Sequence, residues 1–258
     1  MGDRRGRMSS RTIEALTGGV LSVEELKAQL KKVGEQRYHH QHPFHLLMHE
    51  GKLTRGQLQA WALNRYYYQS RIPIKDAIIL SRSDDPNFRR AWRKRVLDHD
   101  GENTPEGGIE RWIRLAEATG LTRERVISCQ EVLPAVRYAV DAYLDLVRNK
   151  SLLEAVASSL TELFSRDLIS LRMGALRQHY PWLSGGLDYF VARLDQAPAD
   201  AQFAFQFVAN HASTYAEQKK AINALREKCE ILWAQLDALY YSYVRPGWPP
   251  PGAFHPEE

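Results

Sequence analysis

The sequence predicts one all-α domain, folded as a compact bundle of about seven or more helices. Four apolar stretches are preceded by a serine or threonine with a glutamate or glutamine three residues later, beginning at Ser22, Thr54, Ser151 and Thr214. This spacing is typical of a capping box, which satisfies free backbone N–H groups of a first helical turn. No stretch alternates apolar and polar residues for long enough to predict a strand.

The composition is that of an ordinary globular protein, with 44% hydrophobic and 26% charged residues. Arginines near the N-terminus account for the net charge of +4, and the rest of the sequence contains no basic face with interleaved aromatic residues. We therefore expect no nucleic-acid partner. Because no membrane-spanning apolar run or signal-peptide core is found, we expect no membrane partner and a cytoplasmic location. Cys129 and Cys229 form no CxxC pattern and predict neither a zinc site nor a disulfide.

Three regions follow from the distribution of these features. Residues 1–21 are rich in Arg, Ser and Gly and predict a disordered tail, with one turn of helix at 12–16. Residues 22–244 contain no repeat or internal linker and predict a single helical catalytic domain. Residues 245–258 are too rich in proline for a helix and predict a tail that lies on the surface or on a partner subunit.

The first helix is expected to run from Ser22 to about Gly34, and an unusual histidine-rich stretch follows it. Five of the nine histidines fall within residues 39–49. Two of them, His45 and His49, stand one helical turn apart, which is compatible with a metal site. The stretch lacks a carboxylate ligand among them, so a packed or substrate-lining wall is the alternative that we favour.

The central element is a long helix predicted over 54–81. Arg65 and Gln69 are four residues apart and share one face. Pro73 cannot donate to the carbonyl of Gln69, so we expect a kink there that opens a pocket for a polar ligand beside three consecutive tyrosines. The alternative is a solvated arginine next to an incidental kink.

The next helix begins at Asp85 and Pro86 and is closed by Gly101. Arg95 and His99 lie one turn apart at its C-terminal end, where the helix dipole favours cations. We therefore expect a raised pKa for His99, and the flanking aspartates 98 and 100 act in the same direction.

Three further helices are expected before residue 150, and then one long helix from Ser151 to about residue 180. On a continuous helix, Glu162, Ile169 and Arg172 would share one face. Tyr143, on the preceding helix, belongs to an apolar stripe. A carboxylate that follows an apolar run, as Glu162 does, is not expected to be merely solvated.

The last two helices complete the bundle. The first carries Tyr189 and Arg193 at spacing four, and its phenylalanine-rich part, 201–211, should pack as core. The second begins at Thr214 and alternates apolar residues by three and four up to residue 243, which is typical of a bundle seam. Lys228 borders that seam.

The sequence lacks the GxGxxG, Walker A, GxSxG and HExxH motifs. None of its nine histidines has Asp or Glu three residues earlier, as carboxylate-bridged di-iron bundles would require. We therefore expect no metal and no organic cofactor, although spacing alone leaves open a haem ligated by a histidine.

Seven segments together resemble the PqqC family of pyrroloquinoline-quinone (PQQ) synthases, in order and with near-matching spacing: YHHQHPFH, WALNRYYYQSRIPIKDA, LDHDG, GGIERW, RYAVDAY, SSLTELF and KCEILWAQLDA. The resemblance implies a haem-oxygenase-like helical bundle. It also implies a cofactor-free oxidase for the final step of PQQ biosynthesis. The enzyme would close a ring in a bicyclic, polycarboxylated precursor and oxidise it with O₂, releasing H₂O₂. The resemblance further implies a homodimer with one site in each bundle.

The resemblance assigns catalytic roles to His99, Tyr189 and Arg193. It assigns substrate binding to nine further residues: Tyr38, His39, Arg65, Gln69, Arg95, Tyr143, Glu162, Arg172 and Lys228. The cations among them would pair with substrate carboxylates, and His99 would transfer protons. At one position the chain departs from the family, because Ile169 stands where some members have a polar, histidine-bearing site.

Two other functions remain open at this point. A relative with the same bundle could be a metal-dependent oxygenase or a thiaminase-like hydrolase, although Cys229 on the seam is a poor nucleophile. A carrier that delivers PQQ would need the same cations, but it would not need His99 beside Tyr189 and Arg193.

Overall fold

The computed structural model describes residues 19–256, so the turn predicted at 12–16 lies outside the described residues. The described part contains helices and no strand, which confirms the all-α prediction. Its elements are α2 (Val23–Arg37), η1 (His39–Gln41), α3 (Pro43–His49), α4 (Arg55–Ser81), α5 (Pro86–Asp100), α6 (Gly108–Ala118), α7 (Arg123–Ser128), α8 (Pro134–Asn149), α9 (Leu152–Ala157), η2 (Ser158–Phe164), α10 (Ser165–His179), η3 (Pro181–Gly186), α11 (Asp188–His211) and α12 (Tyr215–Tyr243).

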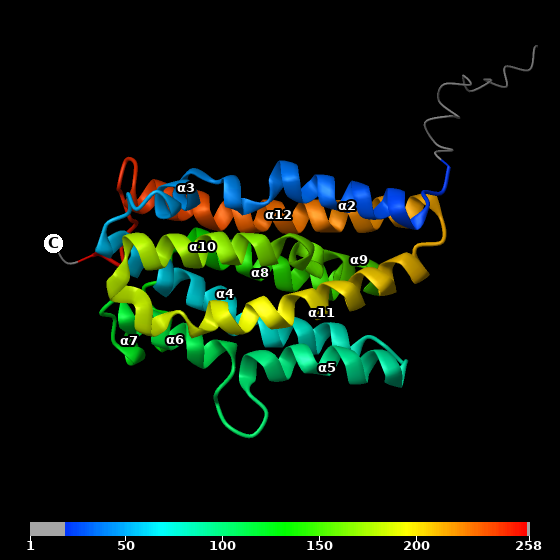
Figure 1. Cartoon of the computed structure of the whole chain (residues 1–258), viewed down its shortest axis with the longest axis horizontal. Coiled ribbons are helices and arrows are strands. Elements are labelled where there is room, and N and C mark those ends of the chain that lie inside the picture. The colour runs from blue at the N-terminus through cyan, green and yellow to red at the C-terminus, as the bar shows by residue number, and fades with distance from the viewer. Residues whose placement is uncertain (1–18, 257–258) are drawn as a thin grey trace, which may run out of the picture.

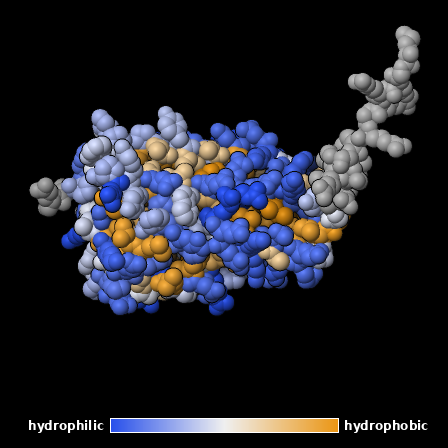
Figure 2. Space-filling view, turned by 90° about the horizontal axis from the view of Figure 1, so that it is seen from above, coloured by the Kyte–Doolittle hydropathy of each residue, from blue (hydrophilic) through white to orange (hydrophobic). Residues whose placement is uncertain are grey.

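The long helices run along the long axis of an elongated bundle (Figure 1). Helix α12 packs against α2, α8 and α9, whereas α4 packs against α5, α6 and α8. The face seen from above is mainly hydrophilic, with apolar patches between the polar residues (Figure 2). None of the helices in 19–256 is long and apolar enough to cross a lipid bilayer.

The four predicted capping boxes are all formed. The side chains of Ser22, Thr54, Ser151 and Thr214 each accept a hydrogen bond from the backbone N–H three residues later. The side chain of that later residue in turn accepts one from the backbone N–H of the capping residue. The helix starts predicted at these residues are therefore confirmed.

Helix α4 continues across the buried Pro73 from Arg55 to Ser81. The proline removes one backbone donor but does not end the helix, which packs against α5, α6 and α8. One helix therefore carries polar side chains into the interior on both sides of the proline.

The single helix predicted from Ser151 to about residue 180 is wrong. The structure has α9, then the 3₁₀ segment η2, then α10. Ser158 Oγ donates to Ala155 O at 2.7 Å, a local bond that competes with regular helix. Because the 3₁₀ segment has a different turn, Glu162 does not share a continuous helical face with Ile169 and Arg172.

The first helix extends to Arg37 rather than ending near Gly34. Gly34 lies inside this helix and faces Phe164. A Cβ at this position would come within 2.5 Å of the Phe164 ring. The glycine lets η2 pack closely against α2, so its role is close approach rather than helix termination.

The phenylalanine-rich segment 201–211 packs against the core, but through its small residues. Ala204 and Val208 are fully buried, whereas Phe203, Phe205 and Phe207 are half-buried. After α12, the chain returns to the end of the bundle, where Phe254 is buried and its N–H donates to Glu131 O at 3.0 Å.

Candidate active site

A pocket lies inside the bundle, and it is lined by side chains from α4, α5, α6, α8, η2, α10, α11, α12 and the histidine-rich segment. Eleven of the twelve predicted site residues line it: Tyr38, His39, Arg65, Gln69, Arg95, His99, Tyr143, Glu162, Arg172, Tyr189 and Arg193. The structure therefore brings together residues that are up to 155 positions apart between Tyr38 and Arg193.

Lys228 is the exception, since it does not line the pocket directly. Its Nζ lies 3.3 Å from the centroid of the Tyr143 ring and 4.3 Å from that of Tyr68, and both rings face the pocket. Ile169 also lines the pocket, so this position offers an apolar surface to a ligand.

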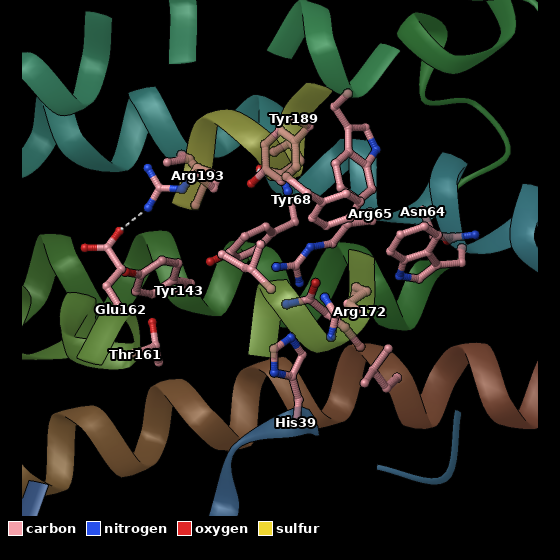
Figure 3. A pocket seen from close by; sticks show the side chains of 18 of the residues that line it. His39, Asn64, Arg65, Tyr68, Tyr143, Thr161, Glu162, Arg172, Tyr189 and Arg193 are labelled. Carbon is pink, nitrogen blue, oxygen red and sulfur yellow. Dashed lines mark hydrogen bonds and ion pairs between the residues drawn. The ribbon is translucent and has the colours of Figure 1, made fainter. Parts of the chain in front are cut away.

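One end of the pocket is a cluster of ion pairs. Arg95 binds Glu162 through two hydrogen bonds of 2.7 and 2.8 Å, and Arg193 Nη2 donates to the same carboxylate at 2.9 Å. Figure 3 shows Arg193 and Glu162 together on one side. Asp76 accepts from Lys75 at 2.5 Å and from Arg95 at 3.2 Å.

Asp200 completes this ion cluster. Its Oδ2 lies 3.3 Å from Arg193 Nη1 and 3.5 Å from Arg95 Nη1. The cluster, defined as Lys75, Asp76, Arg95, Glu162, Arg193 and Asp200, contains three basic and three acidic side chains. Burial alone would lower the pKa of Arg95, but the charges of Glu162, Asp76 and Asp200 hold it well above its ordinary value.

The other end contains three cations that form no ion pair within the described residues, and we call them the open cations: Arg65, Arg172 and Lys228. The Arg65 guanidinium lies 4.0 Å from the centroid of the Tyr68 ring. Arg172 Nη2 contacts only the Nδ1 of His45, at 3.1 Å, and its buried Nε has no partner. Figure 3 shows Arg65 and Arg172 on the side of Tyr68 away from Glu162.

The pKa directions of two open cations follow from this lack of counter-ions. Burial lowers the pKa of Arg172 to about 10. Burial, followed by the charges of Arg65 and Lys75, lowers the pKa of Lys228 well below its ordinary value. Lys228 is 1% exposed and its Nζ lacks a hydrogen-bond partner. A negatively charged ligand would relieve this penalty.

Aromatic rings connect the two ends. Tyr68 and Tyr143 are nearly parallel, with an interplanar angle of 11°. Tyr189 packs edge-on against Trp112 and donates its hydroxyl to Gln69 Oε1 at 3.1 Å. Burial raises the pKa of Tyr68 well above its ordinary value, so its hydroxyl remains protonated. Such walls suit a flat, partly aromatic ligand.

His99 is buried, and the prediction that its pKa is raised is wrong. Burial and the positive charge of Arg193 lower it to about 4, and these effects exceed that of Asp76. Asp98 instead pairs with Lys94 at 2.7 Å, and Asp100 is exposed. His99 is therefore neutral at pH 7. Its Nδ1 lies 3.0 Å from Arg95 O, so it must donate, and Nε2 carries the free lone pair.

Gly107 lets α6 approach this histidine. A Cβ on Gly107 would lie 2.2 Å from His99 O, and one on Gly108 would lie 3.4 Å from His99 Cδ2. Gly107 therefore allows the N-terminus of α6 to close over the end of α5, whereas a Cβ at Gly108 would make ordinary van der Waals contact.

The histidine-rich stretch contributes to the wall of the pocket through His39 and His45. His42 instead binds Asp237 at 3.0 Å outside it. Within 19–256, no group of three His, Cys, Asp or Glu side chains is arranged to hold a metal ion. Burial lowers the pKa of each of the five histidines in this stretch.

Sequence reasoning missed Lys75, Asp76 and Asp200. Lys75 and Asp76 follow Tyr68 and Gln69 by seven residues and so share their helical face. Asp200 follows Arg193 by the same interval. Extending the pairs Arg65–Gln69 and Tyr189–Arg193 by two turns would have revealed Asp76 and Asp200 but not Lys75.

Comparisons with known proteins agree with this architecture. The model of the TENA/THI-4/PQQC family matches residues 27–238. A pyrroloquinoline-quinone synthase of Acidiphilium cryptum is 57% identical over 236 residues, which cover 91% of this chain and 96% of that protein. The corresponding synthase of Granulibacter bethesdensis is 53% identical over 252 residues, covering 97% and 99% of the two chains.

The fold is shared more widely. A domain from Shewanella denitrificans with a haem-oxygenase-like fold superposes with a TM-score of 0.72 at 13% identity, over 92% of this chain and 100% of that one. The similarity confirms the predicted fold and, at this identity, nothing finer. The match to the family model and the identity to the two relatives show that the chain belongs to the TENA/THI-4/PQQC family.

Proposed function

We propose that this chain is an oxidoreductase of PQQ biosynthesis. It uses O₂ to oxidise the bicyclic, polycarboxylated precursor and closes the remaining ring. The relatives named pyrroloquinoline-quinone synthase support the pathway and the reaction class. The observation that carries the substrate assignment is the set of open cations beside aromatic rings, of which Lys228 is buried and Arg65 and Arg172 are half-buried. A polycarboxylate supplies the counter-ions that the described chain leaves out.

The proposed chemistry is a series of two-electron oxidations. In each one, two electrons and two protons leave the substrate and reduce O₂ to H₂O₂. His99, neutral and with a free lone pair at Nε2, accepts a proton from the substrate as electrons leave. Arg193 and the Tyr189 hydroxyl stabilise the negative charge that develops on the reduced oxygen. Protonated His99 then returns the proton to the peroxide.

In this proposal the open cations and Gln69 orient the substrate, and Glu162 accepts a hydrogen bond from a substrate nitrogen. The reaction needs neither a metal nor an organic cofactor, because the electrons pass directly from a conjugated substrate to O₂. The carrier alternative uses the same cations but predicts that bound precursor stays reduced in air.

A single-turnover experiment separates the two. Purified protein, with its metal content measured, is mixed with precursor in air while absorbance and H₂O₂ are followed. We expect PQQ absorbance and peroxide to rise together, and neither to rise under argon. Precursor that binds tightly and remains unchanged in air would favour the carrier.

We also propose a homodimer and a cytoplasmic location. Leu46 of α3 and Leu171 of α10 are 46% and 55% exposed on neighbouring helices, and they offer apolar surface to a second copy. Cys129 and Cys229 are free thiols, as a reducing compartment favours. Light scattering during size-exclusion chromatography measures the mass, and a mass of one chain would contradict the dimer.

A further inference from the structure

Asp200 lies behind the pocket, on α11, and it is 8% exposed. It is not among the residues that line the cavity. Its carboxylate nevertheless lies 3.3 Å from Arg193 and 3.5 Å from Arg95. A buried carboxylate is weak evidence for stability, because desolvation offsets much of the attraction of an ion pair. The position of Asp200 behind two pocket arginines therefore invites a functional explanation.

Glu162 is the nearer counter-ion of both arginines, and both of its oxygens are occupied by them at 2.7 to 2.9 Å. Unlike Asp200, Glu162 also faces the cavity. A ligand that donates a hydrogen bond to Glu162 must share this carboxylate with Arg95 and Arg193. The hydrogen bond from Arg193 to Glu162 then weakens during the oxidation, when the orientation of Arg193 matters.

Asp200 is placed to retain Arg193 at that moment. Its distances to the two guanidinium groups are longer than those of Glu162, so a small shift would tighten them into normal charge-assisted hydrogen bonds. The remaining contact of Arg193 Nη1 is a neutral one, to Gln196 Oε1 at 3.4 Å. Asp200 also brings the ion cluster to equal numbers of acidic and basic groups.

We propose that Asp200 is a positioning residue for the oxidation, holding the Arg193 guanidinium toward the pocket while Glu162 engages the substrate. This inference rests on the proposed function. Burial and the charge of Glu162 raise the pKa of Asp200 to about 6. The carboxylate is consequently ionised at pH 7 and above, where it can act as the second counter-ion.

The test compares Asp200→Asn with the parent and with Asp195→Asn. The first substitution keeps the shape of the side chain and removes its charge. The second makes the same change at an exposed position of the same helix. We expect Asp200→Asn to slow single-turnover oxidation about 10- to 100-fold, the range for loss of a charged hydrogen bond, and to change PQQ affinity less than about threefold. The control should react at the parent rate.

A double-mutant cycle identifies the residue through which Asp200 acts. In an Arg193→Ala background, adding Asp200→Asn should change the rate less than about threefold, because the group to be positioned is absent. Asp200→Glu, which keeps the charge, should restore at least about a third of the parent rate. A merely structural carboxylate would instead give additive effects and no rescue by charge.

Two results would overturn the proposal: parent-like turnover by Asp200→Asn, or the same loss of rate in both backgrounds. If Asp200→Asn does not fold, Asp200→Ser takes its place in the cycle, and failure of both would assign Asp200 to fold stability alone. Absence of turnover by the parent would refute the proposed function itself, and this outcome is distinguishable from a loss confined to the Asp200 variants.

Discussion

The two ends of the pocket use the same kinds of cationic side chain in opposite electrostatic settings. At the ion cluster, nearby carboxylates outweigh burial and raise the pKa of Arg95 and Arg193. At the other end, no carboxylate pairs with Arg172 or Lys228 in the described chain, so burial lowers their pKa. The ion cluster therefore contains its own counter-ions, whereas a ligand would have to supply those of the open cations.

This difference assigns separate tasks to the two ends. A cation that is paired internally is held in one orientation, and such a preorganised donor suits the stabilisation of a transient charge. A buried cation without a partner destabilises the empty protein and binds an anion strongly. We therefore expect substitutions near the ion cluster to change the rate, and substitutions of the open cations to change affinity.

The largest effect is expected at His99, beside the ion cluster. His99→Ala should lower the rate of oxidation by about 10²- to 10⁴-fold, the usual loss for a positioned acid or base. PQQ affinity and the melting temperature should remain near those of the parent, and a partly oxidised intermediate should accumulate in air. Stopped-flow absorbance and a PQQ titration measure both. Turnover at the parent rate would remove His99 from the mechanism.

The same histidine makes stability depend on pH. Its pKa is about 4 in the folded chain and near 6.5 when unfolded, so the folded state binds fewer protons between these values. The contribution of neutral His99 to the free energy of unfolding is fully present above about pH 6.5. It is lost as pH falls to about 4, by about 3 kcal/mol from His99 alone. Denaturant unfolding from pH 7 to 4 should show a shallower loss for His99→Gln than for the parent. The exposed control His211→Gln should lose stability as the parent does.

At the opposite end, Arg172→Ala and Lys228→Ala should weaken PQQ binding. Loss of the charge-assisted contact of Arg172 corresponds to about 1.5–3 kcal/mol, or roughly tenfold to more than a hundredfold in Kd. Lys228 acts from behind Tyr68 and Tyr143, so its removal should have the smaller effect.

The half-buried Arg226, which does not line the pocket and donates a hydrogen bond to Asn223 Oδ1, provides the control variant Arg226→Ala. Fluorescence titration with PQQ measures all three variants. Unchanged affinity in both open-cation variants would break the division between the two ends.

The smallest effect is expected from metal removal. If both ends act through protein charges alone, exhaustive chelation should leave the single-turnover rate unchanged, with metal content checked before and after. Loss of activity that iron restores would favour a metal-dependent oxygenase and would refute the proposed mechanism.

Much of the site could be predicted from the sequence because resemblance and helical spacing both identify side chains that share a face. Arg65 with Gln69, and Tyr189 with Arg193, were predicted in this way, and all four line the pocket. Lys228 was predicted as a direct ligand, yet it lies behind Tyr68 and Tyr143. Spacing places residues around one helix, but it does not show which side chains of neighbouring helices lie between a residue and the pocket.

The pKa of His99 was predicted in the wrong direction for a related reason. The helix end and the flanking aspartates are visible in the sequence, whereas the burial of the ring and the approach of Arg193 come from α11, far along the chain. Desolvation in the interior outweighs the weak, solvent-screened effect of neighbouring surface charges.

By itself the sequence determined that this protein is helical and where its main helices begin, because capping boxes and three-four apolar spacing act within a few residues. Tertiary packing alone decided the meeting of Glu162 with Arg95 and Arg193 and the isolation of the open cations. Those outcomes depend on which charges from distant helices are buried together, and electrostatic energies in a poorly hydrated interior change with every such neighbour.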